Sequence, residues 1–185
     1  MTEELIIAGF GGQGVLSMGK ILAYSGIMQD QEVSWMPSYG PEMRGGTANV
    51  TVIVSDERIS SPVLNEFDTA IILNQQSMDK FESHVKVGGV LIYDPNGIVN
   101  PPTRTDINIY TIEGARLAKE MGNPKIFNMI VFGAFLQIKP VVKIENVVKG
   151  LKKSLNERYH HLIPLNEDAI SMGQKSVNPV LELTS

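Results

Sequence analysis

The chain has 185 residues, which suits one domain able to bury most of its apolar surface on folding. Hydrophobic residues make up 43% of it and charged residues 19%, as in ordinary globular proteins, and a net charge of -4 provides no general attraction to nucleic acid or to an anionic membrane. Cysteine is absent, which excludes disulfides, a thiol nucleophile and cysteine-ligated iron–sulfur clusters within the chain.

A strand that runs into a glycine turn is predicted over residues 5–14, and the apolar spacing after it predicts a helix over 15–25. Gly9, Gly11 and Gly14 fit the pattern G-x-G-x-x-G, in which the glycines permit a tight turn, close approach of a phosphate, and packing of helix against strand. The amides at the helix start would face an anion. The alternative is that the glycines serve only the turn, which this fold can use without a ligand. The candidate binding residues in this stretch are Gly9, Gly11, Gly12, Gln13 and Gly14.

The second predicted strand, Glu32 to Met36, bears on the kind of ligand. Dinucleotide-binding folds place a carboxylate at the end of this strand to hold the ribose hydroxyls, but here the strand ends in Trp35-Met36-Pro37. Glu32 stands at the strand's start and therefore at the wrong edge of the sheet. The sequence argues against NAD.

Residues 36–46 form a second unusual stretch, in which two prolines and three glycines predict a defined loop. We expect this loop to border the same crevice as the glycine turn. Arg44 suits a phosphate or carboxylate, and Tyr39 offers a flat apolar surface with a polar end. In the alternative, Arg44 pairs with Glu42 or with another nearby carboxylate and only fixes the loop. The candidate binding residues here are Ser38, Tyr39, Arg44, Gly45 and Gly46.

The remaining chain alternates between predicted strands and helices. Strands are predicted over 47–55, 59–64 (a short edge strand), 69–73, 90–93 and 107–112. Helices are predicted over 78–85, 113–121, 127–138, 144–155 and 165–173. We expect Gly26 to cap the C-terminus of the first helix of the chain and Ser77 to cap the N-terminus of the helix over 78–85. A loosely held tail is expected over about 175–185. The helix over 127–138 is apolar on nearly every side and must be covered by this domain or by a partner. The pattern predicts an α/β fold: a single Rossmann-like domain over 1–185, with a mostly parallel open sheet and helices on both faces.

The location and metal content follow from simpler features. The acidic start lacks the basic and apolar regions of a signal peptide, and no apolar run reaches the roughly twenty residues needed to span a bilayer, so we expect a cytoplasmic protein. The three histidines have no metal-ligand spacing, and we expect no metal site and no catalytic residue in this chain.

Two blocks of sequence carry a resemblance to a known family. Gly9-Phe10-Gly11-Gly12-Gln13-Gly14-Val15, together with the block from Trp35 to Asn49, resembles the gamma subunit of 2-oxoacid:ferredoxin oxidoreductases. Leu73-Asn74-Gln75 and Gly122-Asn123-Pro124 resemble it as well, so the match covers nearly the whole chain. The second block is closer to the 2-oxoglutarate and branched-chain 2-oxoacid types than to the pyruvate type.

The resemblance implies oxidative decarboxylation of a 2-oxoacid, with 2-oxoglutarate favoured, to an acyl-coenzyme A. Thiamine diphosphate, magnesium and iron–sulfur clusters would lie on partner chains, namely alpha and beta subunits and a ferredoxin-like delta subunit, because this chain has no cysteine and no Gly-Asp-Gly motif. Its crevice could receive the phosphates of coenzyme A, with Arg44 as the electrostatic contact, the glycine amides as donors and Gln13 as a positioning group. Alternatively, the crevice could close over the thiamine site held by other chains. Two rivals stay open at this point: a free-standing nucleotide-binding dehydrogenase and a purely structural scaffold subunit.

Overall fold

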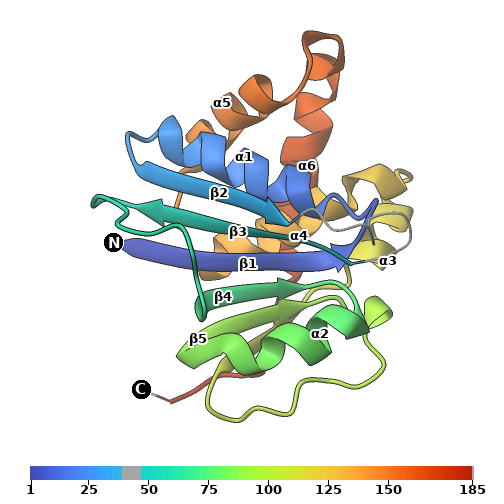
Figure 1. The fold of residues 1–185 in the computed structure, drawn as a ribbon. Coiled ribbons are helices and arrows are strands. Elements are labelled where there is room, and N and C mark those ends of the chain that lie inside the picture. The colour runs from blue at the N-terminus through green and yellow to red at the C-terminus, as the bar shows by residue number, and fades with distance from the viewer. Residues whose placement is uncertain (39–46, 185) are drawn as a thin grey trace.

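The computed structural model describes residues 1–38 and 47–184, which form one open sheet flanked by helices (Figure 1). The sheet has seven strands in the order β2-β3-β1-β4-β5-β6-β7. The strands are β1 (Thr2–Phe10), β2 (Glu32–Ser38), β3 (Thr47–Ser55), β4 (Phe67–Ile72), β5 (Val85–Tyr93), β6 (Asn108–Thr111) and β7 (Asn178–Leu181). The α-helices are α1 (Val15–Ile27), α2 (Gln75–Phe81), α3 (Gly114–Glu120), α4 (Phe127–Ile138), α5 (Ile144–Ser154) and α6 (Ile163–Ser176). Short 3-10 helices are η1 (Glu82–His84), η2 (Pro95–Gly97), η3 (Pro124–Ile126) and η4 (Glu157–Leu162).

Most strands of the sheet point the same way. β1, β4, β5 and β6 are neighbours and pair in parallel. β3 runs antiparallel between β1 and β2, and β7 runs antiparallel beside β6. β2 is therefore parallel to β1 although it does not touch it. The expected α/β fold with a mostly parallel open sheet is confirmed. The alternation of β3 places Val50, Val52 and Val54 together on one buried face.

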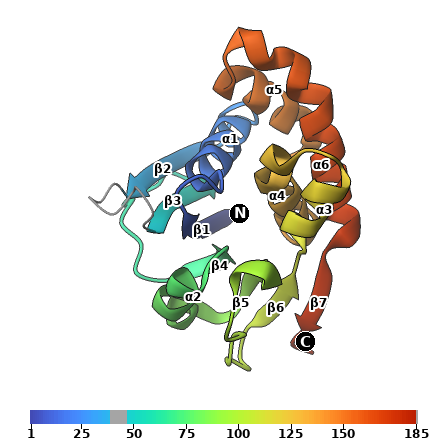
Figure 2. The same cartoon turned by 90° about the vertical axis from the view of Figure 1, so that its right-hand side faces the viewer.

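The helices cover the two faces of the sheet unequally (Figure 2). α1, α3, α4, α5 and α6 lie on one face, where they enclose the larger apolar core, and α2 lies on the other face over a smaller core. Helices on both faces were predicted. No helix within 1–38 and 47–184 is long and apolar enough to cross a membrane.

The apolar helix α4 lies inside the larger core, so this domain itself covers it. Its Phe132 and Phe135 rings stack at 6.2 Å and are almost fully buried. α6 crosses α4 at two glycines: a Cβ built on Gly133 would lie 2.0 Å from the Ile170 carbonyl oxygen, and one built on Gly173 would lie 1.8 Å from the Ile130 carbonyl oxygen. The backbones of the two helices therefore touch directly.

Two predictions of local structure were wrong because tertiary geometry decided them. Residues 59–64 form no strand. β3 ends and β4 begins at the same edge of the sheet, on either side of β1, so the connection between them only has to go around the start of β1. Gly26 does not cap α1 but lies inside it, where its missing side chain makes room for Val33 and Val54.

The boundaries of two other elements also differ from prediction. Asn74, not Ser77, caps α2, and its side-chain oxygen accepts a hydrogen bond from the Ser77 amide at 2.8 Å. The segment expected to be a loose tail contributes β7, which covers the open edge of β6. Beyond it, the Tyr110 hydroxyl donates to the Glu182 carboxylate at 2.8 Å, so β6 also holds the residues after β7.

Candidate functional site

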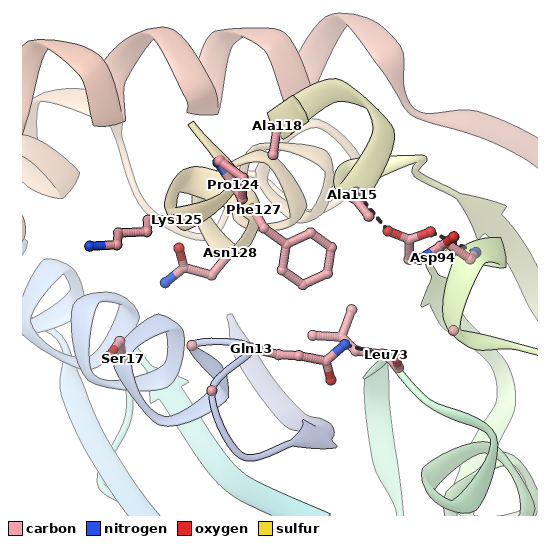
Figure 3. Close-up of a pocket in the computed structure, with 14 residues that line it drawn as sticks. Gln13, Ser17, Leu73, Asp94, Ala115, Ala118, Pro124, Lys125, Phe127 and Asn128 are labelled. Atoms are coloured by element: carbon pink, nitrogen blue, oxygen red, sulfur yellow. Dashed lines mark hydrogen bonds between the residues drawn. The ribbon is translucent and has the colours of Figure 1, made fainter. Parts of the chain in front are cut away.

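The site lies where the connections of the sheet diverge. From β1 the chain leaves through α1 toward β2, whereas from β4 it leaves through α2 toward β5, in the opposite direction along the sheet. In open α/β sheets, ligands bind outside the carboxyl ends of the strands at such a point. A cavity of about 480 Å³ occurs here (Figure 3), and we call it the crevice. The crevice is lined by Gly12, Gln13, Gly14, Ser17, Leu73, Asp94, Asn96, Gly97, Ala115, Ala118, Pro124, Lys125, Phe127 and Asn128.

The turn after β1 supplies one wall of the crevice. Gly12 and Gly14 have φ values of 96° and 76°, a region that favours glycine, so the turn requires them. Gln13 holds the turn in place: its side-chain oxygen accepts from the Phe10 amide at 2.6 Å and its Nε2 donates to the Leu73 carbonyl at 3.2 Å. The side chain of Gln13 thereby ties the carboxyl ends of β1 and β4 together.

Five predicted site residues fall on this turn, and they divide into two groups. Gly12, Gln13 and Gly14 line the crevice. Gly9 does not line the crevice. A Cβ at this position would come within 2.5 Å of the Gln13 side-chain oxygen, so glycine leaves the space that the Gln13 side chain occupies. Gly11 is exposed on the outer side of the turn and does not line the crevice.

The second predicted loop contributes less to the described site. Ser38 ends β2, pairs with Asn49, and is not among the residues that line the crevice, because β3 stands between β2 and β1. The expected role of Ser38 as a binding residue stays a prediction. Tyr39, Arg44, Gly45 and Gly46 lie outside the described residues.

The N-terminus of α1 opens toward the crevice. Gly14, in a left-handed conformation, is its N-cap and provides no side-chain hydrogen bond, and the first backbone bond of the helix is donated by Met18 to the Gly14 carbonyl at 2.9 Å. Within the part of the chain that the structure describes, the amides before Met18 at the helix start donate no hydrogen bond and are available to an acceptor, and the helix dipole adds a positive potential. Ser17 lies in this first turn and lines the crevice.

A buried carboxylate forms the opposite wall. Asp94, 2% exposed, follows β5 and accepts hydrogen bonds from the Asn96 amide at 2.8 Å and the Ala115 amide at 2.9 Å. Burial raises the pKa of Asp94, while these amides act to lower it. Because both oxygens already accept backbone hydrogen bonds, Asp94 ties the turn after β5 to the start of α3 and shapes the wall.

The third wall comes from η3 and α4. Asn123 caps η3 by accepting from the Lys125 amide at 3.0 Å, and Lys125 is an exposed residue that lines the crevice. The Asn128 side chain lies against the glycine turn, since a Cβ on Gly14 would come within 2.5 Å of its Nδ2. A lysine, an amide side chain and an open helix N-terminus all line one cavity, and the Lys125 side chain extends away from Gln13 and Leu73 (Figure 3). Together they suit an anion.

Sequence reasoning missed the walls that come from distant segments. Asp94, Lys125 and Asn128 were not predicted as site residues, although Asp94 stands directly after a buried strand, the usual place for a site residue in this fold. Nothing local in the sequence signals that η3 and α4 fold back onto the glycine turn.

Curated relatives named for three different 2-oxoacids match the chain: ketoisovalerate, 2-oxoglutarate and pyruvate. Ketoisovalerate oxidoreductase subunit VorA of Methanothermobacter marburgensis is 37% identical over 71% of this chain, which spans only 27% of that protein. 2-Oxoglutarate synthase subunit KorC of Methanocaldococcus jannaschii is 33% identical over 84% of each chain. The chain thus spans about a quarter of the VorA protein but most of KorC.

Solved structures share the fold. The gamma subunit of a keto/oxoacid ferredoxin oxidoreductase from Geobacter sulfurreducens is 28% identical, with a TM-score of 0.78 over 94% of this chain and 96% of that one. The 2-oxoglutarate:ferredoxin oxidoreductase of Magnetococcus marinus, solved with 2-oxoglutarate, coenzyme A and succinyl-coenzyme A, is 23% identical, with a TM-score of 0.84 over 94% of this chain and 30% of that one. With a family model that matches residues 4–176, these likenesses show that the chain belongs to the pyruvate ferredoxin/flavodoxin oxidoreductase family.

Proposed function

We propose that the chain is the gamma subunit of a 2-oxoacid:ferredoxin oxidoreductase that converts a 2-oxoacid, with 2-oxoglutarate favoured, to its acyl-coenzyme A. The KorC relative supports this choice because it matches along most of its own length and is named for 2-oxoglutarate. The VorA relative makes a branched-chain 2-oxoacid the first competitor.

The proposal includes a division of labour between chains. Alpha and beta subunits, with a ferredoxin-like delta subunit, would hold thiamine diphosphate, magnesium and the iron–sulfur clusters. The absence of cysteine from this chain is consistent with that division. This chain would act in the cytoplasm as part of the complex.

Within the complex, the crevice would bind the phosphates of coenzyme A. The observation that carries this role is the convergence of three features on one cavity: the open N-terminus of α1, the left-handed Gly12 and Gly14, and the side chain of Lys125. Backbone amides at a helix N-terminus with a nearby cation form a general phosphate site. The amide dipoles of Asn96 and Ala115 offset part of the charge of the Asp94 carboxylate on the opposite wall.

The test uses the assembled enzyme, purified anaerobically from its native cells through a tag on this chain. A brown complex with larger chains and with 2-oxoacid- and coenzyme A-dependent dye reduction supports the proposal, and a panel of 2-oxoacids identifies the substrate. A colourless chain that elutes alone contradicts it. Tight binding of NAD by such a chain would instead support a dehydrogenase.

The role of the crevice is tested with Lys125→Ala. Losing one charge-assisted contact to a phosphate should raise the KM for coenzyme A about tenfold, with kcat and assembly unchanged. Lys80→Ala is the matched control, because Lys80 is an exposed lysine of α2 on the other face of the sheet. An unchanged KM for Lys125→Ala in an intact complex would favour a scaffold role.

Arg44 keeps its proposed role as a further contact to a phosphate. Arg44→Ala should raise the KM for coenzyme A with little loss of assembly. A normal KM together with a complex that falls apart would assign Arg44 to the interface with another subunit.

A further inference from the structure

Part of the sheet, on the side opposite α1, has no helix over it. α2, the helix on that side, packs against β1 and β4 over the smaller core, and within 1–38 and 47–184 no other α-helix lies there (Figure 2). Parallel strands are usually covered on both faces, whereas an antiparallel pair such as β2 and β3 can leave one face uncovered. We call this area the open face, and it consists of Phe10, Ser34, Met36, Thr47, Asn49 and Thr51.

The pairing of the strands places these side chains on one side of the sheet. The valines of β3 belong to the larger core, so the residues that alternate with them, Asn49 and Thr51, point to the other side. Met36 lies directly opposite Thr51, and Phe10 lies directly opposite Thr47. Directly opposite residues of an antiparallel pair share a face, so β1, β2 and β3 all contribute to the open face.

The open face is exposed but carries no charge. Phe10 and Met36 are 40% and 42% exposed, and the other members are partly exposed. None of them is charged, although charged residues make up 19% of the chain. Exposed Met and Phe side chains among small neutral polar ones are typical of the centre of a protein–protein interface, which is depleted in charged residues.

The open face is limited to the carboxyl-terminal part of β1. At the other end of the same side, the segment after β3 covers the sheet: Ile53 is 2% exposed and lines a cavity of about 180 Å³ together with Arg58 and Ser60. No comparable cover from the described residues reaches Phe10 or Met36, which keep their exposure.

The open face ends beside the crevice. Phe10 is the last residue of β1, and its amide donates to the side-chain oxygen of Gln13, which lines the crevice. The helices that wall the crevice, α1, α3 and α4, all lie on the opposite side of the sheet. A polypeptide seated on the open face therefore lies next to the glycine turn without displacing any of these helices.

We infer that the open face docks the partner subunit that carries thiamine diphosphate. This rests on the proposed function, in which the crevice binds coenzyme A and another chain holds thiamine diphosphate, because the two molecules must then meet at this end of the sheet. A second copy of this chain would bring no thiamine diphosphate to the crevice. The VorA relative is consistent with a large neighbour of different sequence, since this chain spans only 27% of that protein.

The first test uses the absence of cysteine from the chain. Met36→Cys introduces a single thiol on the open face, and Ile144→Cys is the matched control, because Ile144 is 40% exposed and begins α5 on the opposite side of the sheet. The assembled enzyme is treated anaerobically with a polyethylene glycol maleimide, and the gel shift of this chain reports its one thiol. In the complex, Met36→Cys should be labelled about tenfold more slowly than Ile144→Cys, and after denaturation the two rates should be equal.

The second test places a charge on the open face. The enzyme is purified through a tag on this chain, and the thiamine diphosphate retained per tagged chain is measured. Thr51→Arg should lower this amount about tenfold or more, because the interface would bury an unpaired guanidinium. Thr51→Ser and Ile144→Arg should retain the full amount.

The outcomes separate this inference from the proposed function. If the wild-type complex retains thiamine diphosphate but Met36→Cys is labelled as fast as Ile144→Cys, or Thr51→Arg retains the full amount, the inference is overturned and the proposed function stands. A wild-type chain that elutes without larger chains contradicts the proposed function itself. If that chain elutes as a pair of copies with the Met36→Cys thiol protected, the open face binds a second copy, which also overturns the inference. If Thr51→Arg yields no soluble chain, the labelling rates decide alone.

Discussion

The contact between α4 and α6 makes a sharp prediction for Gly173→Ala. The new Cβ would lie 1.8 Å from the Ile130 carbonyl oxygen and 2.9 Å from the Ala134 amide nitrogen. Both neighbours are backbone atoms of α4, which no rotamer change can move, so the two helices must separate. Gly173 therefore sets how closely the helices approach.

The size of the effect follows from two opposing contributions. Overpacking a core in this way costs about 3 kcal/mol, at the upper end of the usual range because the clash is with backbone. Alanine gains about 1 kcal/mol over glycine in a helix interior. The free energy of unfolding should therefore fall by about 2 kcal/mol, and Tm by about 4 to 8 °C for a chain of this size.

The assay is thermal and urea unfolding of the purified chain, followed by circular dichroism. Lys175→Ala, at an exposed position of the same helix, is the control and should leave Tm nearly unchanged. Gly133→Ala should resemble Gly173→Ala, and the double variant should cost less than the sum, because one separation of the helices relieves both clashes. If Gly173→Ala were as stable as the original chain or more so, the close approach of the two helices would be refuted.

Three further predictions concern polar groups. Asp94→Asn places an amide donor against backbone amides and should cost about 1 to 3 kcal/mol of stability, visible as a lower Tm; an unchanged Tm would contradict its bonding to the start of α3. Gln13→Glu sets a carboxylate against the Leu73 carbonyl and should lower Tm while raising the KM for coenzyme A; a lower KM would argue against an anion at the turn. Burial raises the pKa of Glu3, so the folded chain keeps this proton at pH values where the unfolded chain, with an ordinary pKa of 4.5, has lost it. The stability that Glu3 contributes is therefore lost as pH rises above 4.5. Glu3→Gln keeps an acceptor for the Thr69 hydroxyl, and the Tm of this variant minus the Tm of the original chain should increase from pH 4.5 to neutral pH. A difference in Tm that stays constant over this range would refute the prediction.

Much of the fold was predictable because its signals are local. The apolar run into the glycine turn, the alternation of residues 47–55 and the periodicity of α5 each identify an element without knowledge of its neighbours. The direction of β3 was not predictable in this way, since alternation describes a half-buried strand but not its partner. Its insertion between β1 and β2 places Ser38 one strand further from the end of β1 than an all-parallel sheet would.

The site was predictable only on the side that one stretch of sequence builds. Gly12, Gln13 and Gly14 follow a pattern whose spacing carries a physical reason. Lys125 and Asn128 reach the same cavity only because α4 lies within the larger core, beside α1. Their contribution depends on packing between segments more than a hundred residues apart, which a single sequence does not encode as a local signal.

The position of α6 affects how the chain is made. Translation delivers the N-terminus first, so every residue that lines the crevice, the last being Asn128, leaves the ribosome before α6 and β7 do. Until α6 has been synthesised, the face of α4 that contains Gly133 is not covered by α6. Its apolar side chains can then contact other chains or chaperones. Nascent chains that stall before Ile163 should therefore aggregate or be retained by chaperones. Correct folding during synthesis then depends on the last segment of the polypeptide, although that segment contributes nothing to the crevice.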